Sequence, residues 1–581
     1  MKTILSGNEA VARGAWEAGC KVAAAYPGTP STEILENIIL YPEIYAEWSI
    51  NEKVALEVAA GASFAGCRSL VAMKHVGLNV AADPLFTMAY SGVTGGFVIV
   101  NADDPGMWSS QNEQDNRHYA RHAKIPMLEP SDSQEARIFV KLGFEISEQF
   151  DTPVLLRLTT RICHSTCLVD LDDRIEHQIS GYTKNIKKRL VLPAHARLLH
   201  IAVEERMKKL AEYSEKFLYN QIEWGQKKLG IITSGISYQY AKEVFPKASF
   251  LKLAFTYPLP EKLIREFSRQ VRNVIIIEEG DPILETEIKA MGIKATGKAR
   301  IPVCGELTPK VIKESFNIKK LDINPEPAPV RPPVLCPGCP HRGVFYIINK
   351  LNLVATGDIG CYTLSALPPL NAMDTCICMG ASITNAHGLD KALGKEFSNK
   401  MVAVLGDSTF FHSGITGLVN AVYNKGNLNL IIVDNYTTAM TGHQPHPGTG
   451  KLAHGETGKR IPPEDIARGC GVEFVKTVNP DDLEETENTI KEALEFDGVT
   501  VLVFRRPCAL LLKRKIPYYV DSENCKSCNI CMRIGCPAIS LTSIPGKEKE
   551  IAVIDADLCF GCGLCAQVCT CEAIKLRDIV R

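Results

Sequence analysis

The feature that most constrains this sequence is a duplicated run of cysteines near its C-terminus. Each copy has three cysteines in the spacing C-x2-C-x2-C and a fourth cysteine further on. Such a run places three thiolates around a [4Fe-4S] cubane, and in duplicated modules the fourth cysteine binds the other cluster. We therefore predict two [4Fe-4S] clusters. One would be bound by Cys525, Cys528, Cys531 and Cys569, and the other by Cys559, Cys562, Cys565 and Cys536.

Three details of this tail depart from the usual pattern. The segment Met532 to Gly535 makes the first spacing one residue longer than is typical, and Thr570 stands where a proline is expected. Cys571 lies outside the pattern and is predicted to be a packed thiol. Zinc ribbons or disulfides are the alternative, but these triplets fit tetrahedral zinc poorly. Without a secretory signal, the 21 cysteines are expected to stay reduced.

Length and composition favour a multidomain globular protein. A chain of 581 residues exceeds what one hydrophobic core usually organises. A formal net charge of -1 gives no basic surface for nucleic acid. We find neither an apolar run long enough to span a membrane nor a signal peptide, so a soluble cytoplasmic protein without nucleic-acid or membrane partners is expected.

Apolar runs alternating with helical stretches predict an α/β fold with parallel sheets. The runs 96–100 and 153–156 belong to a first domain, residues 1–182, and the runs 230–235 and 274–279 to a second, residues 229–323. The charged segment 183–228 between them is predicted to be a helical linker. A proline-rich spacer at 324–333 then precedes a third α/β domain, residues 334–514, and the ferredoxin-type tail, residues 516–581.

Polar residues close two predicted strands of the third domain. Gly406, Asp407 and Ser408 follow the run 402–405, and Asn435 follows Asp434 after the run 430–433. Carboxyl ends of parallel strands open onto one edge, where phosphates bind. Magnesium prefers hard oxygen ligands, so we expect Asp407 and Asn435 to bind Mg²⁺. A backbone carbonyl near Thr437 is a candidate third ligand, and Gly406 would let the backbone approach closely.

These two segments resemble the diphosphate-binding motif of thiamine-diphosphate enzymes. Met379-Gly380-Ala381-Ser382 and Ala386-His387-Gly388 resemble the segment that accompanies it, which makes Gly380 a cofactor-binding candidate. A Gly-Asp-Ser alone is more often an ordinary turn, so the prediction depends on Asn435 and on the strand context. In the nearby loop, His412, His443 and His446 could do acid–base work or simply bond the backbone.

Two N-terminal segments resemble further parts of such enzymes. Residues 48–57 resemble the strand end and helix that carry the glutamate activating the thiamine, which implies this role for Glu52, with Glu57 as the weaker alternative. Glu52 could instead merely favour the first turn of a helix. Residues 26–30 resemble the Tyr-Pro-x-Thr-Pro signature of 2-oxoacid:ferredoxin oxidoreductases, which implies that Thr29 faces the substrate carboxylate.

A third [4Fe-4S] cluster has a candidate site at Cys336-Pro337-Gly338-Cys339-Pro340-His341 and Cys361. Related oxidoreductases carry a cluster beside the thiamine on cysteines comparable to Cys336, Cys339 and Cys361. The fourth ligand stays open among Cys376, Cys378, Cys470 and Cys508. A cysteine-bearing cofactor loop without metal is the alternative.

Together, and in this order, these motifs resemble the large subunit of thiamine-diphosphate-dependent 2-oxoacid:ferredoxin oxidoreductases, in the branch that acts on arylpyruvates. The resemblance implies a pyrimidine-binding domain, a transketolase C-terminal-like domain, a diphosphate-binding domain and the cluster tail. It implies oxidative decarboxylation with coenzyme A and ferredoxin, and a smaller beta subunit as partner. A pyruvate or branched-chain substrate, a non-catalytic electron-transfer subunit and a non-oxidative decarboxylase are the rival predictions.

Overall fold

The computed structural model describes residues 2–318, 329, 331–545 and 549–577. The chain divides into two compact units, Met1–Pro325 and Glu326–Arg581. Both contain predominantly parallel sheets with helices, so the predicted α/β fold is confirmed. The predicted proline-rich spacer at 324–333 lies largely outside the described residues. The predicted domain boundaries within the two units remain predictions.

Unit 1 is built around a seven-stranded sheet. Its strands pair in parallel except at the β12–β6 edge, which is antiparallel. In spatial order they are β12 (Phe255–Tyr257), β6 (Met127–Leu128), β7 (Val154–Thr159), β5 (Phe97–Asp103), β4 (Ser69–Lys74), β2 (Val22–Ala25) and β3 (Tyr45–Trp48). Every residue of β5 is buried, as expected for a central strand covered on both faces.

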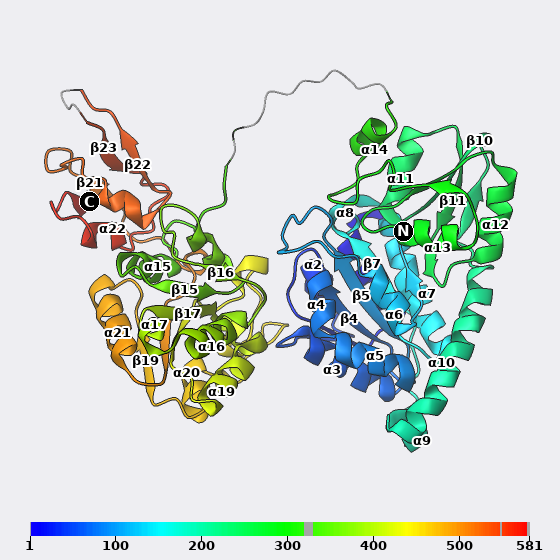
Figure 1. Cartoon of the computed structure of the whole chain (residues 1–581), viewed down its shortest axis with the longest axis horizontal. Coiled ribbons are helices and arrows are strands. Elements are labelled where there is room, and N and C mark those ends of the chain that lie inside the picture. The colour runs from blue at the N-terminus through cyan, green and yellow to red at the C-terminus, as the bar shows by residue number, and fades with distance from the viewer. Residues whose placement is uncertain (1, 319–328, 330, 546–548, 578–581) are drawn as a thin grey trace. The chain divides into compact units, whose positions relative to one another are not determined.

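Helices cover both faces of this sheet (Figure 1). One hydrophobic core joins the sheet to α1 (Gly7–Glu17), α2 (Thr32–Ile38) and α7 (Ser133–Phe150). The other core joins it to α3 (Glu52–Phe64), α4 (His75–Val80) and α5 (Ala82–Ser91). The carboxyl ends of β2, β3, β4 and β5 therefore share one edge, which carries the residues predicted for cofactor activation.

A second sheet of unit 1 follows the long helix α10 (Pro193–Ser214), which occupies the predicted linker and buries Val203 and Leu210. The helices that pack on this second sheet include α11 (Gly235–Val244), α12 (Glu261–Gln270) and α13 (Ile283–Ala290). The sheet has the order β14 (Ala295–Thr296), β13 (Val274–Ile277), β10 (Gln226–Ser234), β11 (Ala248–Leu253) and β9 (Gln221–Glu223). The next strand along the chain, β12, leaves it and joins the seven-stranded sheet.

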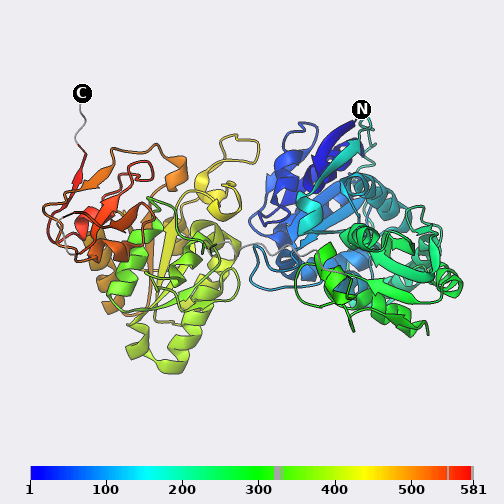
Figure 2. The same ribbon diagram turned by 90° about the horizontal axis from the view of Figure 1, so that it is seen from above.

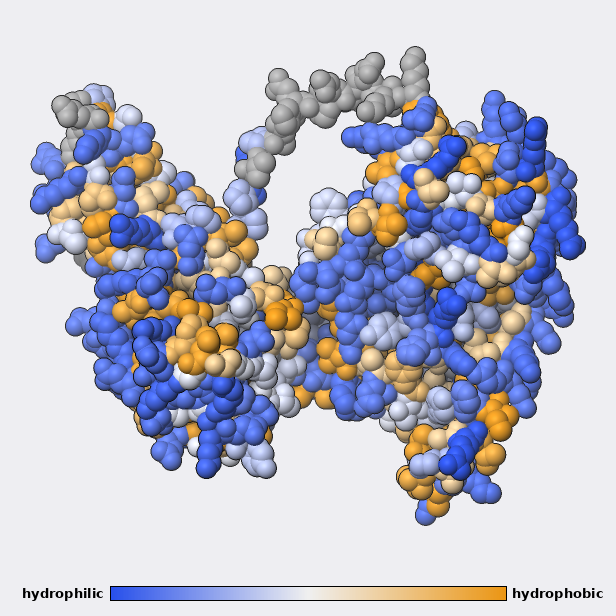
Figure 3. Space-filling view, viewed as in Figure 1, coloured by the Kyte–Doolittle hydropathy of each residue, from blue (hydrophilic) through white to orange (hydrophobic). Residues whose placement is uncertain are grey.

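Exposed aliphatic side chains gather around the short helix α9 (Ile186–Arg189), where Figure 3 shows apolar surface. Ile186, Leu190 and Leu192 each keep about half of their area exposed (51, 49 and 48 %). These side chains contrast with the sheet cores, where the aliphatic residues are buried.

Unit 2 contains a six-stranded, all-parallel sheet. Its order is β16 (Thr375–Cys376), β15 (Val354–Gly357), β17 (Met401–Gly406), β18 (Leu428–Asp434), β20 (Val499–Arg505) and β19 (Phe474–Val478). The helices α15 (His341–Lys350) and α21 (Leu483–Glu495) share one core with it, and α16 (Ala381–Leu393) and α19 (Ile415–Tyr423) the other.

The cysteine-rich tail belongs to the same compact unit (Figure 2, red). It holds two small antiparallel pairs, β21 (Tyr518–Val520) with β24 (Ile574–Leu576) and β22 (Ile539–Thr542) with β23 (Ile551–Ile554). One hydrophobic core continues from the six-stranded sheet into the tail and includes Cys531, Ile539 and Cys565. Across the described ranges, no helix combines the length and apolar character that a membrane span requires.

Candidate active site

Four strand ends of the unit 2 sheet lead to polar or sulfur-bearing residues, and a fifth leads to Gly380. Because all its strands run in parallel, their carboxyl ends lie at one edge. Asp358 follows β15 and Asp407 follows β17, while Asn435 follows β18. Gly380 comes shortly after β16, and Cys508 comes shortly after β20. The fold thus brings together Asp407, Asn435 and Gly380, which were predicted, with Asp358 and Cys508.

Asp407 is almost fully buried, and two backbone N–H groups and His446 hold its carboxylate. Oδ1 accepts from the backbone N–H of Ser408 at 2.9 Å, and Oδ2 accepts from that of Asn435 at 3.2 Å. His446 Nε2 lies 3.1 Å from Oδ2. Burial opposes ionisation, but His446 and these donors outweigh it and lower the pKa of Asp407. A carboxylate is therefore kept charged at the strand end.

Gly406 is required by close packing at this turn. A Cβ there would come within 2.9 Å of the Tyr362 ring. Beside it, burial and the charge of Asp407 raise the pKa of Asp434 to about 6, against the effect of Arg505. Arg505 Nε donates to Asp434 at 2.7 Å. Asp434 is thus restrained by an arginine, whereas Asp407 is held by backbone N–H groups and His446.

Asn435 and Thr437 supply further oxygens beside Asp407. Asn435 Oδ1 accepts from the backbone N–H of Thr437 at 3.2 Å. Tyr436 between them has a φ of 62°, a left-handed conformation that turns the backbone sharply. Thr437 is 4 % exposed, and within the described chain its Oγ1 has no hydrogen-bond partner. An unsatisfied buried hydroxyl beside a carboxylate and an amide fits the hard-oxygen surroundings of magnesium and a diphosphate.

Asp358 organises the segment that contains Gly380. Its carboxylate accepts from the backbone N–H of Gly380 at 2.9 Å and of Ser382 at 3.2 Å, at the start of α16. Burial raises its pKa to about 6. Gly380 has a φ of +89°, which favours glycine, and a Cβ there would also clash with Ser413. The sequence contained a signal for Asp358, the Gly357-Asp358-Ile359-Gly360 turn, but no role was predicted for it.

His341 links this edge to the Cys336–Cys339 loop. It is buried, and burial lowers its pKa to about 4, so the ring is neutral near pH 7. Its Nε2 therefore accepts from Asn435 Nδ2, at 3.3 Å. On the other side, Asn435 O accepts from the backbone N–H of Cys508 at 3.0 Å. The Mg²⁺ candidate Asn435 thus contacts residues of both cysteine-bearing segments.

Four cysteines of unit 2 form a group beside this edge. Burial, together with smaller effects of the nearby thiols of Cys508 and Cys336, raises the pKa of Cys361 to about 11. Burial likewise raises the pKa of Cys339 to about 12, with smaller effects of the same sign from Cys361 and Cys336. Clustered buried thiols repel one another as thiolates unless a metal compensates their charge. Of the four candidates left open by the sequence, Cys508 is the one that joins this group.

The tail cysteines surround two cavities in the crossed grouping expected from the sequence. The first cavity is lined by Cys525, Cys528, Cys531, Cys569 and also Cys571. The second cavity is lined by Cys536, Cys559, Cys562 and Cys565, together with Gly338 of the upstream loop. Among the described residues, no group of three or more His, Cys, Asp or Glu is arranged to hold a single metal ion. Cavities lined by four or more cysteines suit clusters, whose ligands bind different irons.

In unit 1, Glu52 begins α3 after β3, and Asn51 caps that helix by accepting from Val54 N–H at 2.9 Å. Glu52 is 4 % exposed, and its carboxylate packs so closely on Gly77 that a Cβ there would come within 2.7 Å. Burial lowers the pKa of Lys74, at the end of β4, to about 8, while the charges of Asp104 and Glu52 oppose that change. Lys74 and Asp104 were not predicted, because only the sheet order brings them to this edge.

Thr29 lies at the same edge of unit 1, after β2. It is half-buried, and its carbonyl accepts from Ser109 Oγ at 3.3 Å. The preceding Gly28 packs against the Lys74 side chain, so a Cβ there would come within 3.1 Å of it. Lys74 thus packs on the segment that carries Thr29 and interacts electrostatically with Glu52.

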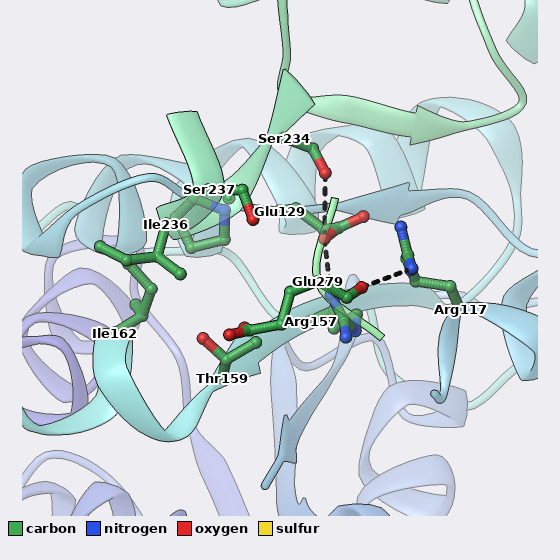
Figure 4. Close-up of a pocket in the computed structure, with 11 residues that line it drawn as sticks. Arg117, Glu129, Arg157, Thr159, Ile162, Ser234, Ile236, Ser237 and Glu279 are labelled. Atoms are coloured by element: carbon green, nitrogen blue, oxygen red, sulfur yellow. Dashed lines mark hydrogen bonds and ion pairs between the residues drawn. The ribbon is translucent and has the colours of Figure 1, made fainter. Parts of the chain in front are cut away.

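A separate polar pocket of unit 1 lies between its two sheets (Figure 4). Arg157 binds Asp103 at 2.7 Å and Glu129 at 2.8 Å, and Arg117 binds Glu278 at 2.7 Å. Ser234 from β10 also donates to Glu129 at 3.4 Å. We term this set of buried ion pairs the arginine network.

Models of three protein families match the chain. "Pyruvate flavodoxin/ferredoxin oxidoreductase, thiamine diP-bdg" matches residues 13–201, and "Thiamine pyrophosphate enzyme, C-terminal TPP binding domain" matches residues 358–504. The "4Fe-4S binding domain" matches residues 552–575. The second match begins at Asp358 and includes Asp407 and Asn435.

Curated relatives match over nearly their whole length. "Indolepyruvate oxidoreductase subunit IorA" of Archaeoglobus fulgidus is 45 % identical, covering 99 % of this chain and 97 % of its own. The protein of the same name from Pyrococcus horikoshii is 43 % identical with the same coverage. "2-oxoglutarate synthase subunit KorA" of Archaeoglobus fulgidus is 26 % identical over 52 % of this chain.

Among solved structures, a 2-oxoglutarate:ferredoxin oxidoreductase from Magnetococcus marinus is 19 % identical. The match has a TM-score of 0.45 and covers 54 % of this chain and 65 % of that one.

Proposed function

Because this chain belongs to the family of the indolepyruvate oxidoreductase subunits IorA, we propose that it catalyses ferredoxin-dependent oxidative decarboxylation of arylpyruvates with coenzyme A. The predicted family and enzyme class, a thiamine-diphosphate enzyme with iron–sulfur clusters, are confirmed. The arylpyruvate substrate, the acyl-coenzyme A product and the smaller beta subunit belong to the proposal.

One observation supports the chemistry most strongly: Asn435 at the cofactor edge contacts both segments of the cysteine group. Its amide donates to His341, two residues after Cys339, and its carbonyl accepts from Cys508 N–H. A group that generates electrons and a group that accepts them would therefore be neighbours within unit 2. A non-oxidative decarboxylase has no use for this arrangement.

When bound, thiamine diphosphate supplies a carbon nucleophile that attacks the keto carbon of the substrate and makes loss of carbon dioxide feasible. We assign Asp407 and Asn435 to Mg²⁺, with Thr437 completing the oxygen set. Asp358 holds Gly380 N–H and Ser382 N–H in place at the start of α16. The neutral His341 fixes the orientation of the Asn435 amide.

We assign cofactor activation to Glu52 and contact with the substrate carboxylate to Thr29. Glu52 is a buried acid at a strand end, where a carboxyl group can hold a proton at a fixed position. Lys74 packs against Gly28, which precedes Thr29, and interacts electrostatically with Glu52. Its ammonium group would stabilise an anionic substrate or the ionised form of Glu52.

We further propose three [4Fe-4S] clusters, with Cys508 as the fourth ligand of the third. That cluster would bind Cys336, Cys339, Cys361 and Cys508. Gly338 of the same loop lines the second tail cavity, so the third cluster and that tail cluster would be adjacent. Electrons would then leave through the tail to ferredoxin.

Anaerobic turnover of indolepyruvate, phenylpyruvate and pyruvate tests the proposal, with coenzyme A and a ferredoxin or viologen acceptor. The complex with the beta subunit should reduce the acceptor fastest with the two arylpyruvates. Preference for pyruvate would reject the substrate assignment. Absence of thiamine from anaerobically purified protein would favour a non-catalytic subunit, and aldehyde release without an acceptor would favour a non-oxidative decarboxylase.

Iron content tests the third cluster separately. The wild-type complex should hold about twelve irons in this chain, and Cys508→Ala should remove about four. Cys470→Ala is the matched control, because Cys470 lies outside the group, and it should keep all of them. Equal iron in both variants would exclude Cys508 as a ligand.

A further inference from the structure

The two tail cavities differ in one respect that the predicted assignment of four cysteines to each cluster does not explain. Four cysteines line the second cavity, whereas five line the first, because Cys571 is added to the expected four. A cubane needs one thiolate for each of its four irons. One thiol of the first cavity is therefore in excess.

The excess thiol lies beside the fourth ligand of that cavity. Cys569 Sγ and Cys571 Sγ are 3.6 Å apart. A turn produces this pairing, because Cys569 O accepts from the backbone N–H of Glu572 at 3.2 Å and Glu572 has a left-handed φ of 49°. The chain thus returns on itself within three residues, and both sulfurs are presented to one cavity.

The equivalent turn of the second cavity carries no spare thiol. There Cys536 is followed by Pro537 and Ala538, and Ile539 N–H donates to Cys536 O at 3.0 Å. Both turns therefore close with a similar backbone hydrogen bond, but only the turn of the first cavity has a cysteine two residues after the ligand. The second cavity is an internal control for the first.

We propose that Cys571 is an alternative ligand of the first tail cluster, so that either Cys569 or Cys571 completes the cubane. In the exchange, the iron–sulfur bond to Cys569 breaks as the bond to Cys571 forms. The Cys571 proton passes to the departing Cys569 thiolate, and no electron is transferred. The proposal depends on the proposed function only in requiring that this cavity holds a cluster.

The test measures iron and the EPR spectrum of the reduced protein in the whole anaerobic complex. Cys569→Ala and Cys571→Ala should each keep the wild-type iron content, while the double variant should lose about four irons and one cluster signal. Cys536→Ala, the control in the second cavity, should lose about four irons as a single variant. Loss of the cluster in either single variant of the pair would overturn the proposal.

Alkylation of the wild-type complex gives a second test that needs no variant to fold. With one thiol of the pair bound to iron, iodoacetamide should label one cysteine per chain at this turn. Peptide mass spectrometry should then find the label on Cys569 in some chains and on Cys571 in others. Label confined to a single position would overturn the proposal. A wild-type complex without tail clusters would instead contradict the proposed function itself.

Discussion

Buried acids are held in opposite ways in the two units. In the arginine network of unit 1, Asp103 and Glu129 bind Arg157, and Glu278 binds Arg117. At the sheet edge of unit 2, Asp358 and Asp407 accept hydrogen bonds from backbone N–H groups, and Asp407 also from His446. In the described part of the chain, neither of these two carboxylates is paired with a lysine or arginine.

This difference separates acids whose charge an arginine compensates from acids held by backbone N–H groups, among which we propose that Asp407 binds Mg²⁺. An arginine compensates the charge of a buried carboxylate within the chain, so the ion pairs of the unit 1 network need no external cation. Backbone N–H groups orient a carboxylate without neutralising its charge, which leaves that charge available to a cation. The comparison therefore predicts structural effects from changes in the network and binding effects from changes at the edge.

The largest expected effect concerns Glu52, an acid of unit 1 outside the arginine network. Glu52→Gln should lower carbon dioxide exchange by about 10²–10⁴-fold, because an amide cannot transfer the activating proton. Iron content should not change. Glu57→Gln, on the exposed side of α3 where Glu57 pairs with Lys53, is the matched control. Exchange at the wild-type rate in Glu52→Gln would reject the assignment.

Asp407→Asn should lower the same exchange by about 10²–10³-fold and weaken retention of thiamine during gel filtration. The amide keeps the size of the side chain but removes the charge that would bind Mg²⁺. Raised Mg²⁺ should recover part of the loss. Asp465→Asn, at an exposed pair with Arg468, serves as the control. A variant that lost stability but still bound thiamine normally would place Asp407 with the structural acids.

Arg117→Met should reduce the unfolding free energy of unit 1 by about 3 kcal/mol, because it leaves buried carboxylates without their cation. All four tryptophans, at positions 16, 48, 108 and 224, lie in unit 1, so their fluorescence reports on that unit alone. Arg121→Met breaks an exposed pair with Glu287 and should cost less than about 1 kcal/mol. Equal losses in the two variants would contradict a structural role for the network.

The smallest expected effect is a pH dependence of the unfolding free energy of unit 1, caused by buried acids in and beside the arginine network. Burial raises the pKa of Glu279 from 4.5 to about 7, and that of Asp103 from 3.8 to about 6. Such groups stabilise the folded state at low pH and lose that contribution as pH rises through the folded pKa. The unfolding free energy of unit 1 should therefore fall between about pH 4.5 and 7, by roughly 1–3 kcal/mol.

Glu279→Gln should flatten part of this decline, because the amide does not titrate and can still accept from Leu307 N–H. The exposed Glu243→Gln should leave the slope unchanged. An unaltered slope in Glu279→Gln would show that other groups cause the pH dependence.

The residues that local sequence could predict are those that end a strand in a recognisable turn. Asp407 and Asn435 follow buried apolar runs directly, and the tail cysteines have a fixed spacing. Asp358, Lys74 and Cys508 could not be assigned in this way. Their neighbours come from distant segments, and only the order of the parallel strands brings them together.

The same limit explains why the place of β12 in the seven-stranded sheet could not be predicted. Its three residues pair with β6 across more than a hundred positions of sequence. So short an apolar run carries no period that could indicate its partner. It also explains why the arginine network was not predicted, since Arg117 and Glu278 belong to different parts of unit 1 and no local pattern relates them.

The buried side chain of Arg342 has a consequence for the speed of electron flow. It donates to the carbonyls of Leu335 and Cys336 in the upstream loop, and to those of Ile534 and Gly535 in the tail. One rigid, planar guanidinium thus acts as a spacer between two cysteine-bearing segments. Tunnelling between redox centres there would cross a constant gap, and its rate would not depend on how fast one segment swings toward the other.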